Sequence, residues 1–135
     1  MILLENSLFK LHYNPVTDIL EATYPDFYDF LFTEIKDHMD KMVEIIHNYD
    51  IKRVLLNLTS SILSVNHEQN LALSSQLLLG IEKTRVEKLA RLEAENDAGE
   101  TSMYYSIEHL LRTENPPFQV KVFSTRDEAL NWLKD

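Results

Sequence analysis

Cysteine is absent from the 135 residues of this chain, and glycine occurs only as Gly80 and Gly99. Without cysteine there are no disulfide bonds, thiolate nucleophiles or cysteine-based zinc sites, so the fold must depend on packing and backbone hydrogen bonds. Two isolated glycines cannot form the glycine-rich loop that lets backbone N–H groups approach a phosphate. The sequence therefore argues against nucleotide hydrolysis and dinucleotide chemistry.

Positive charge and long apolar runs are also scarce. The chain has 13 Lys and Arg residues against 22 Asp and Glu residues, a formal net charge of −9. Nucleic-acid binding is driven by basic residues that neutralise phosphates, so we expect no nucleic-acid partner. No apolar run approaches the roughly 20 residues that cross a bilayer, and residues 1–4 lack the features of a secretory signal. We expect a cytoplasmic protein with no membrane span.

The composition is that of a water-soluble globular protein. Hydrophobic residues make up 44% of the chain and charged residues 26%, and the length suits one domain spanning residues 1–135. Two extended runs, residues 8–13 and 16–24, flank the turn dipeptide Asn14-Pro15 and predict an opening β-hairpin.

A long amphipathic helix is predicted next, with Asp26 as its N-cap and its end near Asn48. Its apolar residues recur at steps of three and four, as one helix face requires. They are Phe27, Leu31, Ile35, Met39, Met42, Ile45, Ile46 and Tyr49. The nearly continuous apolar run at 53–58 then predicts a central strand covered on both faces.

The second half alternates between helices and strands. Residues 66–81 predict a helix, and residues 86–93 are assigned to a strand although Glu, Lys, Leu and Ala there favour a helix. A helix over 103–111 and an alternating strand over 118–122 follow. Thr125 caps a last helix with Glu128 as its capping-box partner.

This order of elements, β-β-α-β-α-β-α-β-α, predicts an α/β domain. Strands that alternate with helices run parallel through right-handed crossovers, whereas the opening hairpin is antiparallel. The fold class is therefore a single-domain mixed β-sheet with helices packed on it.

The element order and residues 120–133, which read Val-Lys-Val-Phe-Ser-Thr-Arg-Asp-Glu-Ala-Leu-Asn-Trp-Leu, resemble bacterial STAS-like domains, a family that includes the anti-sigma-factor antagonists. The resemblance implies a small regulatory domain that binds another protein. In some members, phosphorylation of a serine near the start of the helix after the central strand switches binding.

The phosphoserine pattern of that family is missing here. Residues 57–59 resemble the strand end that precedes the acceptor, but residues 64–68 read Ser-Val-Asn-His-Glu in place of Asp-Ser-Ser-Gly. Ser60, Ser61 and Ser64 are the substitute candidates, and their registers do not match. Their hydroxyls fit turn and capping roles better, so a binding role is expected without the phosphoswitch.

Catalytic and metal-binding patterns are also poorly formed. None of the five histidines pairs with another at the i, i+4 spacing that directs two imidazoles to one metal ion. His67 and Glu68 are adjacent and point about 100° apart on a helix, which disfavours an acid/base pair acting with Ser64. We expect no enzyme activity, no cofactor and no metal.

The remaining prediction concerns apolar surface. Apolar residues of the 66–81 helix spread over more than half of its circumference, which favours an interaction face and a homodimer. That face comprises Leu71, Leu73, Leu77, Leu78 and Ile81, and Tyr28 and Phe32 are two further exposed candidates. The leading hypothesis is a non-enzymatic regulatory or protein-interaction domain. The alternative is a binder of a small apolar or lipid-like ligand held between the sheet and the aromatic helix, and an enzyme ranks third.

Overall fold

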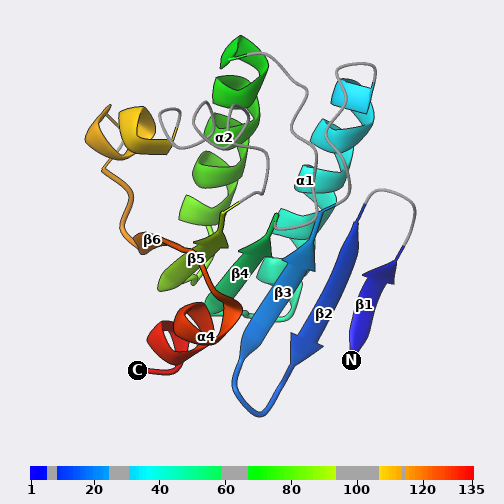
Figure 1. Ribbon diagram of the computed structural model, residues 1–135. Helices are drawn as coiled ribbons and strands as arrows, with labels where there is room; N and C mark the ends of the chain where they lie inside the picture. The colour runs from blue at the N-terminus through cyan, green and yellow to red at the C-terminus, as the bar shows by residue number, and fades with distance from the viewer. Residues whose placement is uncertain (6–8, 25–30, 59–66, 94–106, 114) are drawn as a thin grey trace.

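The computed structural model describes residues 1–5, 9–24, 31–58, 67–93, 107–113 and 115–135. Six strands form one mixed sheet, and their order in space follows their order in the chain (Figure 1). They are β1 (Ile2–Glu5), β2 (Lys10–Asn14), β3 (Ile19–Thr23), β4 (Arg53–Asn57), β5 (Lys88–Leu92) and β6 (Gln119–Phe123). The expected α/β class with a mixed sheet and helices packed on it is confirmed.

The strand β1 was not expected from the sequence. It pairs antiparallel with β2 at one edge of the sheet, so the hairpin of β2 and β3 is part of a three-stranded antiparallel unit. Its four residues, Ile-Leu-Leu-Glu, lack the alternation that marks a half-buried strand. Its pairing with β2 is what identifies it as a strand. The chain therefore begins with three strands before α1, where the sequence predicted two.

Helices cover both faces of the sheet. The helices α1 (Phe32–Asn48) and α2 (His67–Glu82) pack on one face together with the helical segment 107–113, and α4 (Arg126–Lys134) packs on the other (Figure 1). In the described part of the chain, none of the helices has both the length and the apolar character needed to cross a bilayer.

The helix α1 forms because its apolar residues share one face. Ile35, Met39, Met42 and Ile46 are buried, and the helix ends at Asn48 as predicted. Tyr49 differs from the prediction, since it is 50% exposed. The proposed N-cap region, 25–30, lies outside the described residues.

The strands β4 and β5 lie inside the sheet with both faces covered. Val54, Leu55 and Leu56 of β4 are buried, as are the last four residues of β5. The strand prediction for 86–93 is therefore confirmed. Burial on both faces of a parallel sheet outweighs the helix propensity of the β5 residues, because propensity differences are only tenths of a kcal/mol per residue.

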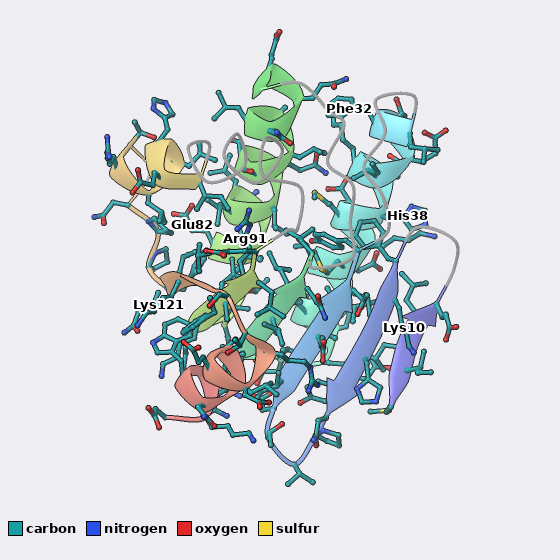
Figure 2. All side chains as sticks on the ribbon, viewed as in Figure 1. Lys10, Phe32, His38, Glu82, Arg91 and Lys121 are labelled. Carbon is teal, nitrogen blue, oxygen red and sulfur yellow. The ribbon has the colours of Figure 1, made fainter. Side chains whose placement is uncertain are left out.

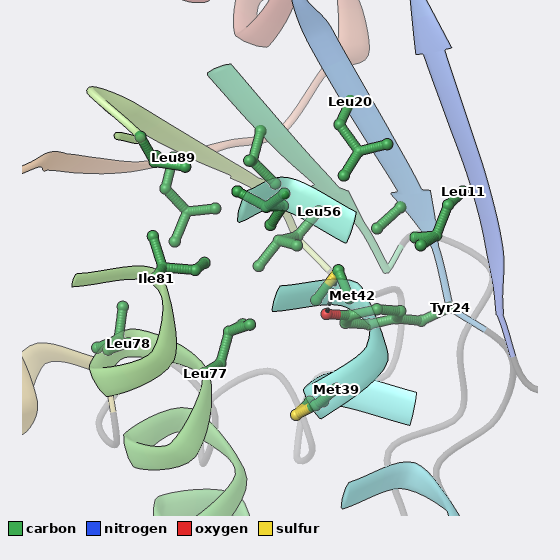
Figure 3. Close-up of a cluster of buried hydrophobic side chains, with 14 of the residues drawn as sticks. Leu11, Leu20, Tyr24, Met39, Met42, Leu56, Leu77, Leu78, Ile81 and Leu89 are labelled. Carbon is green, nitrogen blue, oxygen red and sulfur yellow. Dashed lines mark hydrogen bonds between the residues drawn. The ribbon is translucent and has the colours of Figure 1, made fainter. Parts of the chain in front are cut away.

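Two apolar cores result, one on each face. The larger core lies between the sheet and α1 and α2, where Leu20, Met42, Leu56 and Ile81 meet (Figure 3). The smaller core lies under α4 and includes Phe123. Thr125 caps α4 as predicted: its hydroxyl oxygen accepts from the Glu128 backbone N–H at 3.3 Å, and its O–H donates to the Glu128 carboxylate at 3.0 Å.

Candidate functional site

The leucine face expected to bind a partner lies mostly inside the larger core. Four of its five residues are buried and at most 5% exposed: Leu73, Leu77, Leu78 and Ile81. The fifth, Leu71, is partly exposed. The prediction that these four side chains form a surface is wrong, because α2 contacts the sheet on one side and α1 on another. The same helix presents Leu79 to solvent, at 41% exposure.

Of the other candidate residues, Phe32 lies in the part of the chain that the structure describes. Tyr28, Ser60, Ser61 and Ser64 lie outside the described residues. Phe32 begins α1, packs partly buried against the larger core and has the Lys36 ammonium 5.5 Å from its ring centroid (Figure 2).

A small apolar cavity lies between the sheet, α2 and the segment 107–113. Its volume is about 30 Å³, and its described walls include Tyr24, Leu73 and Arg91. Arg91 is only 1% exposed and points from β5 toward α2 (Figure 2). Burial raises the pKa of the Tyr24 hydroxyl, and the nearby Arg91 charge opposes that rise. A volume of about 30 Å³ is far below the roughly 300–1,000 Å³ of typical ligand sites, so this cavity does not fit a drug-sized ligand.

The strand β6 forms the edge of the sheet opposite β1. It pairs with β5, and no other strand of the described chain pairs with it. The Gln119 N–H donates to the Glu87 carbonyl, and the Phe123 carbonyl accepts from the Glu93 N–H, both at 3.0 Å. Bonding groups alternate between the two sides of a strand, so the N–H and C=O groups of Val120 and Val122 point away from β5.

A groove runs beside this free edge. It has a volume of about 300 Å³ and lies between the segment 107–113 and β6. Ile107 and Leu111 line it from the helical side, and Val120 and Val122 line it from the strand, each half-buried. The groove therefore joins an apolar wall to a row of outward backbone donors and acceptors.

Two charged groups border the groove. Lys121 is exposed at the middle of β6, and its ammonium lies 5.4 Å from the Phe123 ring centroid (Figure 2). Glu108 lies on the helical wall and accepts a hydrogen bond from Arg112 at 3.3 Å, one turn away. Among the described residues Lys121 makes no ion pair, so its charge stands in solvent at the edge of the sheet.

A second groove, of about 120 Å³, lies on the α4 face near β2 and β3. Glu21 and Arg126 join across it in an ion pair with a shortest distance of 2.7 Å. Burial alone would raise the pKa of Glu21, but hydrogen bonds from Arg126 and Asn57 outweigh burial, and the pKa lies below its ordinary value. Glu21 and Arg126 neutralise each other here, so their contact is explained by its structural role of joining α4 to the sheet.

The residues at the β6 edge were not singled out from the sequence as functional. The alternation of Val120 and Val122 predicts the strand, but not that it is the last in the sheet. The available signal is Lys121, because lysine in the middle of a short strand is typical of exposed sheet edges.

Comparisons with protein families, with curated proteins and with solved structures found no match for this chain. The resemblance to STAS-like domains stays a hypothesis that rests on the order of elements and on residues 120–133.

Proposed function

We propose that this chain is a non-enzymatic protein-interaction domain that binds an extended segment of a partner protein along the free edge of β6. One observation carries the proposal. The backbone N–H and C=O groups of Val120 and Val122 point away from β5, beside a groove of about 300 Å³ that these two residues line. An added strand gains main-chain hydrogen bonds from such an edge and specificity from pockets for alternate side chains.

The position of the groove suits such a segment. A strand added to β6 continues the sheet, so every second side chain falls on the face that carries the segment 107–113. There it meets Ile107, Leu111, Val120 and Val122, which are half-buried and form the apolar wall. The hypothesis of a STAS-like regulatory domain also favours a protein partner.

The alternative, a binder of a small apolar or lipid-like ligand, has less support. Ligand sites are typically about 300–1,000 Å³. The cavity under α1 and α2, with Met39 of α1 among its walls, has about 30 Å³, so a ligand held between the sheet and the aromatic helix would have to separate the helices from the sheet.

A titration followed by NMR tests the proposal. The probe is a nine-residue peptide in which valine alternates with threonine, added to isotope-labelled protein. We expect shift changes and slower amide exchange at Val120 and Val122. Peptide binding without changes at these amides would refute the proposal.

Two substitutions at one position sharpen the test. Val122→Pro removes an outward N–H, which an edge strand tolerates, and is expected to abolish binding. Val122→Ile keeps the N–H and is expected to retain it. Should Val122→Pro fail to fold, Leu111→Lys places a charge in the apolar wall and is expected to weaken binding. Equal binding by the wild type and the folded variants would contradict the proposal.

A further inference from the structure

We infer that the segment bound at β6 carries an acidic side chain opposite Lys121, flanked on both sides by apolar residues. This inference rests on the proposed strand addition and names the chemistry of the partner. It follows from a difference between the two faces of the edge strand: one face carries the charged Lys121, and the other carries Val120 and Val122 beside the groove.

Lys121 is the only charged residue of β6. Its side chain projects to the α4 face, opposite to the face of Val120 and Val122, because side chains alternate along a strand. It is exposed at the edge (Figure 2), and its ammonium lies 5.4 Å from the centroid of the Phe123 ring. Among the other side chains of β6 on that face, Gln119 is neutral and exposed and Phe123 is buried.

A residue directly opposite Lys121 on an added strand has its Cβ atom about 4.5–5.5 Å away and on the same face. An opposite charge there is favourable and a like charge is unfavourable, and an acidic side chain therefore suits this position. The residues before and after it fall on the other face, where Val120, Val122 and Leu111 form the apolar wall. The expected segment reads apolar, acidic, apolar.

The same charge disfavours a second copy of this chain as the occupant. Two β6 strands paired antiparallel and centred on Lys121 would set the two ammonium groups opposite each other. Each strand in that arrangement faces a like charge instead of a carboxylate. A distinct acidic partner is thus favoured over self-pairing in this register.

Three synthetic peptides test the inference. All alternate valine with threonine, and their central residue is glutamate, glutamine or lysine. By fluorescence anisotropy at low salt we expect the glutamate peptide to bind about two- to fivefold more tightly than the glutamine peptide, and the lysine peptide to bind most weakly. The preference should shrink at high salt, because exposed charges are screened.

The variants Lys121→Glu and Lys121→Gln complete the experiment. Lys121→Glu should reverse the order of the glutamate and lysine peptides, and Lys121→Gln should make the three peptides equal. If wild-type protein binds all three equally, the acidic preference is wrong while strand addition stands. If it binds none, strand addition itself is wrong. If sedimentation shows a dimer that Val122→Pro dissociates, the occupant is a second copy and the acidic partner is refuted.

Discussion

The guanidinium of Arg126 binds the carboxylate of Glu21 through two parallel hydrogen bonds: Nη2 donates to Oε1 at 2.7 Å, and Nε donates to Oε2 at 3.2 Å. The two residues lie 105 positions apart, and their contact ties the first turn of α4 to β3. Asn57 of β4 donates to the same carboxylate at 3.1 Å. Two-pronged arginine–carboxylate pairs are geometrically specific, so this contact fixes where α4 begins on the sheet.

The Glu21 contact predicts a dependence of stability on pH. The pKa of Glu21 is lowered in the folded protein, so its contribution is present above the ordinary value of 4.5 and is lost as the pH falls through the lowered pKa. Glu21→Gln should therefore cost about 1 kcal/mol at pH 7 and progressively less below pH 4.5. Urea unfolding at several pH values measures this difference. The exposed Glu87→Gln is the control, and a cost for Glu21→Gln that does not change with pH would contradict the assignment.

A second prediction concerns the contact between α1 and α2. A Cβ atom added at Gly80 would lie 2.9 Å from Cγ2 of Val43, closer than real Cβ contacts, so the two helices approach each other through this glycine. Gly80→Ala normally stabilises a helix interior by about 1 kcal/mol. Here the clash should cancel that gain and leave the protein equally or less stable in thermal unfolding.

A double-mutant cycle isolates the cause of this effect. Val43→Ala removes the crowding methyl groups, so Gly80→Ala in that background should recover most of the roughly 1 kcal/mol helix gain. Additive effects of the two substitutions would show that Val43 is not what requires a glycine at position 80.

The third prediction separates core leucines from surface leucines on α2. Leu73 is fully buried, and Leu73→Ala should cost about 2–5 kcal/mol in the free energy of unfolding. Leu79 is 41% exposed, and Leu79→Ala should stay within about 0.5 kcal/mol. Urea unfolding and sedimentation of both variants give the measurement. If Leu73→Ala changed the oligomeric state and left stability intact, our placement of Leu73 in the core would be wrong.

Much of the fold is predictable because several elements carry local signals. The stripe of Ile35, Met39, Met42 and Ile46 specifies α1 by periodicity, and Thr125 with Glu128 specifies the start of α4 by capping chemistry. The strand β5 required one step more. It follows from the alternation of strands and helices, while its own residues favour a helix.

The rest depends on contacts between distant residues. The leucines of α2 are spread in the same way whether another helix of this chain or a partner protein covers them. In the structure, α1 and the sheet together cover them. Likewise, Lys121 is the single local hint that β6 is an edge, since an edge is defined by having no further strand beside it, and among the described residues only β5 pairs with β6. The candidate site was therefore not predictable from spacing alone.

The sequential order of the strands has a consequence for how the chain is made. Each strand adds to the one synthesised just before it, so the sheet can be assembled in the order in which the ribosome delivers it. At every stage the newest strand is also the edge to which the next one is added, and β6 is the last strand of the sheet in the described part of the chain. A partner strand at β6 would be a seventh strand, added in the same way but between two chains instead of within one.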